Sequence, residues 1–213
     1  MGKLLIFLML PCTGSVARVF LGRLVCIAQL EVEPSGGILR SKTSAQDVES
    51  IVSSWQNPEA VNWVHKMMDK YGMPDEATAK RLIWHNNGPW KRTMIVDEAI
   101  PHNFPVPHQD FLYQVASYRV NRDKACDVLN FDESVILDVT KGEVGSRCHM
   151  EEANFITTNM AVEIMEGKRN TEEARQFMAM SMMEKKNMEY MNSLRFTPMS
   201  EDQARTEGTK AQM

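Results

Sequence analysis

The chain contains few of the residues that define several protein classes. Among its 213 residues are only 11 glycines and 9 prolines, too few for a collagen-like or low-complexity chain. It has no internal repeat of solenoid length and no C-x-x-C pair of the redox or zinc-binding type. Lys and Arg (24) are outnumbered by Asp and Glu (28), so binding of nucleic acid through phosphate neutralisation is not indicated.

No catalytic motif is present, and no apolar run is long enough to cross a bilayer. The two candidate runs cover residues 4–10 and 16–30, and Arg18 and Arg23 interrupt the second. Neither reaches the roughly 20 apolar residues that a membrane-spanning helix needs. A hydrophobic fraction of 43% and a charged fraction of 24% are nevertheless typical of a globular protein.

The beginning of the chain is typical of an export signal. Lys3 precedes the apolar run at 4–10, and Ser15-Val16-Ala17 offers small residues to a signal peptidase. Residues 1–44 have a net charge of +3, whereas the whole chain has −4. We therefore predict a periplasmic or secreted protein whose only membrane contact is the leader. The alternative is a mis-assigned start and a cytoplasmic protein.

Composition divides the chain into three parts. The stretch 31–42 contains Pro34-Ser35-Gly36-Gly37 and predicts a linker, whereas 197–213 is polar and predicts a disordered tail. We expect a leader and linker at 1–43, a single α+β domain at 44–196 and the tail at 197–213. The apolar residues of the domain are expected to form a single core.

Periodicity places helices before and after a group of strands. Asn57-Pro58-Glu59 predicts a helix start, and Tyr71-Gly72 predicts its end. Residues 111–120 fit either a strand or a helix. The remaining predictions are a helix at 44–55, a hairpin at 81–96 around Asn86-Asn87-Gly88-Pro89, an extended connector at 100–108, a short helix at 121–130, strands at 134–140 and 143–148, and helices at 153–164 and 170–194.

This order predicts the α+β class, with a small, mainly antiparallel sheet and helices packed on one face. Five segments resemble a family of uncharacterised bacterial proteins with signal-like leaders: 70–76, 84–92 (WHNNGPWKR), 101–108 (PHNFPVPH), 140–143 and 151–155. The resemblance covers about 57–177. It implies export and a single domain, but no activity, and family members have Asp where His149 stands.

Two histidines and an aspartate in a proline-rich segment are candidate metal ligands. His102, His108 and Asp110 offer imidazole and carboxylate groups that suit first-row divalent metals, and His85 is a candidate fourth ligand. The alternative is that these histidines hydrogen-bond to backbone carbonyls.

Aromatic and basic residues of the expected sheet are candidate ligand-binding residues. Trp84, Trp90 and Tyr113 would line a groove, and Lys91 and Arg92 would hold an anion. The alternative is that the aromatic residues belong to the core.

Sulfur-containing residues give two further hypotheses. The chain has 17 methionines, and the dense group at 178–183 suggests a Cu(I) site or, alternatively, pliable packing. In an exported protein Cys126 and Cys148 would form a disulfide or remain free thiols. Because neighbouring strand residues point to opposite faces, Cys148 and His149 are not expected to pair.

We therefore expect a non-catalytic, exported protein that binds a small ligand or a protein partner, without a cofactor. The alternative is a metal-dependent protein or enzyme centred on His102, His108 and Asp110. A third class is an envelope scaffold that uses the methionine-rich last helix as a contact face.

Overall fold

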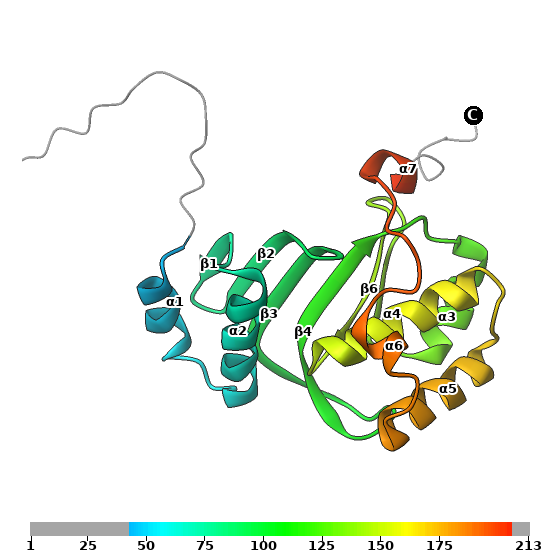
Figure 1. Cartoon of the computed structure of the whole chain (residues 1–213), viewed down its shortest axis with the longest axis horizontal. Coiled ribbons are helices and arrows are strands. Elements are labelled where there is room, and N and C mark those ends of the chain that lie inside the picture. The colour runs from blue at the N-terminus through cyan, green and yellow to red at the C-terminus, as the bar shows by residue number, and fades with distance from the viewer. Residues whose placement is uncertain (1–42, 206–213) are drawn as a thin grey trace, which may run out of the picture. The chain divides into compact units, whose positions relative to one another are not determined.

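A six-stranded antiparallel sheet forms the centre of the protein in the computed structural model, which describes residues 43–205 (Figure 1). The strand order is β1-β2-β3-β4-β6-β5. The strands are β1 (Glu76–Thr78), β2 (Arg81–Asn87), β3 (Trp90–His102), β4 (His108–Ser117), β5 (Val135–Asp138) and β6 (Glu143–Cys148).

Helices precede, interrupt and follow the strands. Within the described residues they are α1 (Ala45–Val52), α2 (Pro58–Tyr71), α3 (Ala125–Phe131), α4 (Glu151–Met165), α5 (Thr171–Glu184), α6 (Met188–Asn192) and α7 (Glu201–Arg205), with a 3-10 turn at Arg122–Lys124. Figure 1 shows α2 and α4 lying across the same face of the sheet. The predicted α+β class is confirmed.

Local signals set the ends of these elements as expected. The Asn57 side chain accepts hydrogen bonds from the backbone N–H groups of Glu59 and Ala60 at the start of α2, and Gly72 ends that helix with a φ of 82°. The β2–β3 hairpin turns at Gly88-Pro89, between the paired residues Asn87 and Trp90. Asn86 and Gly88 have positive φ angles, which suit asparagine and glycine. Residues 111–120, which fitted two structures, fall mostly in β4.

The predicted connector at 100–108 is a second hairpin, between β3 and β4. After an irregularity between Ile95 and Ile100, strand pairing resumes at Ile100↔Asp110 and runs through Pro101↔Gln109 to His102↔His108. Proline predicts an interrupted strand because it lacks an N–H donor. Pro101 is the second-last residue of β3, next to the turn, and it still pairs with Gln109.

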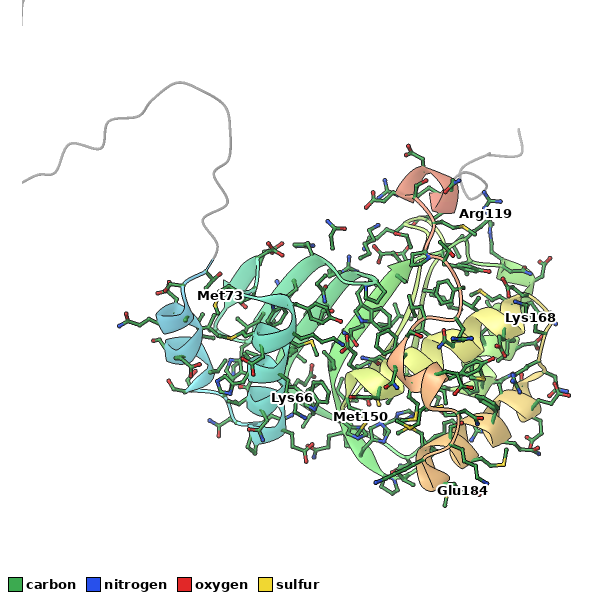
Figure 2. All side chains as sticks on the ribbon, viewed as in Figure 1. Lys66, Met73, Arg119, Met150, Lys168 and Glu184 are labelled. Carbon is green, nitrogen blue, oxygen red and sulfur yellow. The ribbon has the colours of Figure 1, made fainter. Side chains whose placement is uncertain are left out.

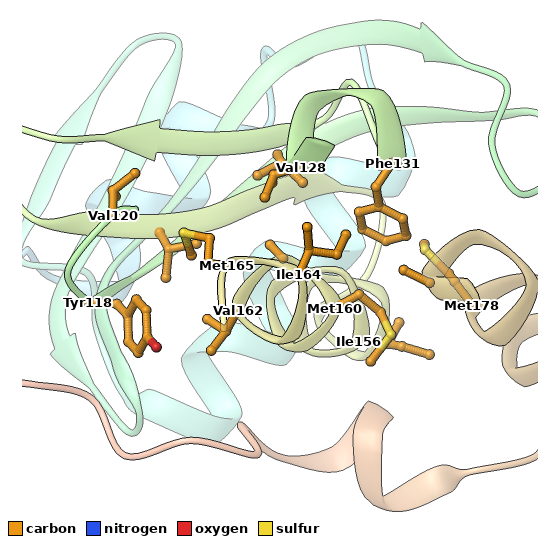
Figure 3. Close-up of a cluster of buried hydrophobic side chains, with 14 of the residues drawn as sticks. Tyr118, Val120, Val128, Phe131, Ile156, Met160, Val162, Ile164, Met165 and Met178 are labelled. Atoms are coloured by element: carbon orange, nitrogen blue, oxygen red, sulfur yellow. The ribbon is translucent and has the colours of Figure 1, made fainter. Parts of the chain in front are cut away.

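Buried hydrophobic side chains form two main clusters and a small third one, so the expectation of a single core is wrong. One cluster surrounds α4 and includes Phe131, Ile156 and Met178 (Figure 3). The other joins α1 and α2 to β2–β4. The third contains Trp90, Ala116 and Phe155. Glu151, at the start of α4, accepts hydrogen bonds from Tyr71 Oη (2.6 Å), Trp90 Nε1 (2.8 Å) and Gln114 Nε2 (3.0 Å). These bonds connect α2, the sheet and α4 through polar groups instead of continuous apolar packing.

Two further predictions need correction. The expected helix at 170–194 is broken between α5 and α6, where Lys185 and Asn187 both have left-handed backbone conformations. Residues 197–205 of the expected tail are part of the fold, because Met199 N–H bonds to Ser117 O and Ala204 is buried on Gly142. Residues 1–42 of the expected leader and linker (1–43) and residues 206–213 lie outside the described residues. In the part that is described, no helix combines the length and apolar character of a membrane span.

Candidate metal centre

The pairing of β3, β4 and β6 brings four chemically reactive side chains to one face of the sheet. Directly opposed residues share a face, and so do residues two apart along a strand. His108 and Asp110 therefore share the face of Leu112, whose partner on β6 is Cys148, and His102 opposes His108. This is the helix-covered face.

The polar atoms of these side chains lie close together. Nε2 of His108 is 3.3 Å from Sγ of Cys148 and 3.1 Å from Oδ1 of Asp110. Nδ1 of His149 is 3.5 Å from the same sulfur. We call His108, Asp110, Cys148 and His149 the β4–β6 cluster. The ligand atoms of its two histidines and its cysteine lie within 4.8 Å of one another.

His149 joins the cluster because β6 ends at Cys148. The chain then turns through Met150, which is labelled in Figure 2 and is the N-cap residue of α4. The alternation of side chains in a strand does not extend past its end. The expectation that Cys148 and His149 would not pair is therefore wrong.

A second layer of polar groups surrounds Asp110. Its Oδ2 lies 3.3 Å from Nε of Arg147 and 3.5 Å from Nδ1 of His102. On the other side of the His102 ring, Nε2 lies 3.4 Å from Oδ1 of Asp132. His102 thus stands between two buried carboxylates and borders the β4–β6 cluster.

Several buried atoms of this region have no hydrogen-bond partner. They include Oδ1 of Asp110 and Nδ1 of His102. The 3.1 Å approach of His108 Nε2 to Asp110 Oδ1 is therefore a close contact without hydrogen-bond geometry. A buried acceptor without a well-aligned donor costs about 1–3 kcal/mol, and Asp110 Oδ1 therefore has room for one further donor or ligand.

The tautomer of His108 is set by its other ring nitrogen. Nδ1 lies 2.8 Å from the carbonyl oxygen of Val106, which can only accept, so Nδ1 carries a proton. In the neutral ring the lone pair is then on Nε2, the atom that faces Cys148 and Asp110. A backbone carbonyl that orients the distal N–H is a common feature of metal-binding histidines.

Burial and charge shift the pKa values of the cluster in different directions. Burial lowers the pKa of His108, but Asp110 and Cys148 outweigh it and raise the pKa to about 10. Burial would raise the pKa of Asp110, but His102 and His108 bring it to about 2. Burial raises the pKa of Cys148, whereas burial and His108 together lower that of His149 to about 4. At neutral pH the cluster holds a carboxylate, an imidazolium, a thiol and a neutral imidazole.

The proposed fourth metal ligand, His85, lies elsewhere. Its Nε2 is 2.6 Å from Oε1 of Glu76 at the β1–β2 edge. Of the four residues predicted as metal ligands, the structure groups His102, His108 and Asp110 and leaves His85 out. Cys148 and His149 take part instead, together with the neighbouring Asp132 and Arg147, none of which was predicted as a site residue.

The predicted aromatic groove is not formed by the two tryptophans. Trp84 and Trp90 are each 1% exposed, and their indole N–H groups donate to Gly72 O and Glu151 Oε1. Both are core residues, as in the alternative interpretation. Tyr113 lies under the guanidinium of Arg147.

The basic residues Lys91 and Arg92 already have anionic partners within the fold. They pair with Glu143 at 3.1 Å and 2.8 Å. An anion held by these two side chains would therefore compete with Glu143, which is buried beside them.

The sulfur-containing residues are also separated. Cys126 is exposed and Cys148 buried, and both are free thiols. Met178 is buried, whereas Met180 and Met183 are exposed, so the methionines expected as copper ligands do not share one environment.

Comparison with known proteins adds no relative. No protein-family model matches the chain, and no curated protein or solved structure does either. The resemblance to uncharacterised exported bacterial proteins therefore stays a prediction, and the function has to be argued from the site itself.

Proposed function

We propose that the protein binds one divalent transition-metal ion through the side chains of the β4–β6 cluster, and that zinc is the preferred ion. This proposal develops the metal-dependent alternative and replaces two of its four predicted ligands. His102 becomes a positioning residue that orients Asp110.

The observation that carries the proposal is the spacing of the ligand atoms. Zinc bonds of about 2.0–2.1 Å to nitrogen, 2.0–2.2 Å to oxygen and 2.3 Å to sulfur, arranged as a tetrahedron, place nitrogen and oxygen about 3.4 Å apart and nitrogen and sulfur about 3.6 Å apart. The spacing of His108, Cys148 and His149 is close to this, with 3.3 Å and 3.5 Å between nitrogen and sulfur and all three ligand atoms within 4.8 Å of one another. Oδ1 of Asp110 lies 3.1 Å from Nε2 of His108, but Asp110 groups with His102 and His108 rather than with Cys148 and His149, so its side chain would have to move to reach the same ion.

The chemistry of the donors supports zinc over the alternatives. A set of two imidazoles, one thiolate and one carboxylate combines borderline, soft and hard ligands that zinc accepts together. The carboxylate makes the set less suitable for Cu(I), which favours soft sulfur ligands. His108, Cys148 and His149 would supply three ligands, and Asp110 would fill the fourth tetrahedral position if its side chain moved toward the ion. A filled tetrahedron favours a structural or storage role over catalysis at the metal.

A cysteine nucleophile is the main competing interpretation, since Cys148 contacts a histidine. Two observations argue against it. Cys148 is only 4% exposed, and burial raises the pKa of its thiol, whereas catalytic cysteines are accessible and have lowered pKa values. Metal coordination would instead deprotonate the thiol outright.

The test is metal binding by the purified full chain after removal of bound metal with a chelator. Cobalt(II) is expected to bind with one equivalent and to give a near-ultraviolet sulfur-to-cobalt charge-transfer absorption, which zinc then abolishes by displacement. Zinc at 100 times its dissociation constant should stabilise the fold by about 2.7 kcal/mol. Absence of any saturable cobalt or zinc binding would refute the proposal, and binding without the sulfur absorption would exclude Cys148 as a ligand.

A further inference from the structure

A second group of possible metal ligands lies beside the β4–β6 cluster and shares one residue with it. One ligand atom each of His102, His108 and Asp110 lies within 4.8 Å of the other two. The three residues come from the paired ends of β3 and β4, which Figure 1 shows side by side. Two imidazoles and one carboxylate are the ligand set of many iron(II) sites, and this group contains no sulfur.

Two ligand atoms of this group are buried without a well-aligned hydrogen-bond partner among the described residues. They are Nδ1 of His102 and Oδ1 of Asp110. The Asp110 side chain is 0% exposed, and Arg147 donates to its other oxygen, Oδ2, at 3.3 Å. Folded proteins normally satisfy buried polar atoms, so a cation between Asp110 and the two histidines would complete the coordination of both atoms.

The outer nitrogen of each histidine faces an acceptor. Nδ1 of His108 lies 2.8 Å from Val106 O, and Nε2 of His102 lies 3.4 Å from Oδ1 of Asp132, whose side chain is 1% exposed. Metal-binding histidines almost always have a carbonyl or carboxylate at the nitrogen that does not bind the ion. The nitrogens left for an ion are Nδ1 of His102 and Nε2 of His108, and both lie next to Asp110.

The distances suit an ion with octahedral coordination. Bonds of about 2.1 Å at right angles place neighbouring ligand atoms about 3.0 Å apart. Nε2 of His108 is 3.1 Å from Oδ1 of Asp110, and Nδ1 of His102 is 3.5 Å from Oδ2 of the same carboxylate. The His102 side chain is 11% exposed and lines a pocket of about 300 Å³, so an ion from solvent would enter beside this residue.

We infer that His102, His108 and Asp110 form a second metal position, which takes a harder divalent ion of the manganese(II) or iron(II) kind. In this position His102 is a ligand. Because His108 can offer only Nε2, the second position and the sulfur-containing position of the β4–β6 cluster cannot be occupied together. The second position stands without the zinc site, and only this mutual exclusion rests on the proposed function.

Manganese(II) is the probe for the second position, since it prefers oxygen and nitrogen to sulfur. Electron paramagnetic resonance of the metal-free full chain measures free manganese, whose six-line signal disappears on binding. One equivalent is expected to bind saturably, and one equivalent of zinc should release it. Absence of saturable manganese binding would overturn the inference, and manganese that stays bound when the chain is saturated with zinc would overturn the exclusion.

Substitutions separate the two positions. His102→Gln should weaken manganese binding at least tenfold and retain the sulfur-to-cobalt absorption. Cys148→Ser should abolish that absorption and leave the manganese affinity within about twofold of wild type. Asp110→Asn, which keeps the size of the side chain, should also weaken manganese binding at least tenfold and tests the position if His102→Gln does not fold. Equal losses of manganese affinity in Cys148→Ser and in either of the other two variants would contradict a separate position.

The wild-type chain distinguishes the failure of this inference from that of the proposed function. Saturable manganese binding without any sulfur-to-cobalt absorption would support the second position and count against coordination by Cys148. The absorption without manganese binding would support the β4–β6 cluster and refute the second position.

Discussion

The sulfur of Cys148 lies 3.3 Å from Nε2 of His108, although 40 positions separate the two residues in the chain. The contact follows from the antiparallel pairing of β4 with β6, in which Leu112 opposes Cys148. It places the thiol beside an imidazole that on its other contact approaches the Asp110 carboxylate at 3.1 Å, and the first two predictions below concern this group.

Replacement of Cys148 by serine should lower zinc affinity about 100-fold or more. Loss of an outer-shell partner alone typically costs about 10–100-fold, and here a direct ligand is removed. Competition against a chromophoric chelator measures the change. Cys126→Ser is the matched control, because Cys126 is an exposed free thiol and its replacement should leave the affinity unchanged. Equal losses in both variants would mean that the effect is not due to coordination.

Zinc affinity should rise steeply with pH. His108 has a pKa of about 10, and the pKa of Cys148 is raised, so both are protonated at neutral pH. Asp110 and His149, with pKa values of about 2 and about 4, are already deprotonated. Binding therefore displaces two protons, and the logarithm of the affinity should increase by about two per pH unit between pH 6 and 8. Calorimetry in buffers of different ionisation enthalpy counts these protons, and a pH-independent affinity would contradict the prediction.

Glu143→Gln should destabilise the fold by about 2 kcal/mol at pH 7, because Arg92 and Lys91 lose their buried partner. Both cations retain some solvent contact, which keeps the expected loss below that of a fully buried pair. Burial would raise the pKa of Glu143, but Arg92 and Lys91 outweigh it and lower the pKa.

The pH dependence of this loss has a defined sign. A carboxyl group with a lowered folded-state pKa stabilises the fold above its unfolded pKa of about 4.3, and this contribution disappears as the pH falls through the folded-state value. The difference in urea unfolding free energy between wild type and Glu143→Gln should therefore shrink below about pH 4. Glu98→Gln, at an exposed position, serves as the control and should show little change at either pH.

Gly145→Ala should destabilise the fold by about 3 kcal/mol or more. A Cβ atom at this position of β6 would lie 2.0 Å from the carbonyl oxygen of Gln114 and 2.7 Å from Val115 Cα, both on the paired strand β4. Gly167→Ala is the comparison: it has open space around it but a φ of 72°, so the cost is about 1–2 kcal/mol of backbone strain. Thermal unfolding of both variants tests the order, and a milder effect at Gly145 would show that β4 and β6 separate easily.

Most secondary structure was predictable because its signals are local. Asn57-Pro58 marks the start of α2, and Gly88-Pro89 marks the β2–β3 turn, through conformations that neighbouring residues alone determine. The break between α5 and α6 was missed because the apolar spacing continues across Lys185 and Asn187. The β3–β4 hairpin was missed because proline weakens a strand signal without preventing pairing.

The site was predicted in part for a related reason. His102, His108 and Asp110 were recognised because they are close in sequence and in a stiff segment. Asp132 and Arg147 have no such signal, and Cys148 and His149 were set aside on the assumption that a strand continued beyond Cys148.

The sequence by itself determined the α+β class, the order of helices and strands, and three of the residues that meet at the candidate centre. Tertiary structure alone decided that β6 pairs with β4, because strand pairing depends on hydrophobic packing between segments that are distant along the chain. That pairing brings Cys148 and His149 to His108 and Asp110, and it divides the hydrophobic residues between two main clusters, because polar groups around Glu151 occupy the space between α2, β4 and α4.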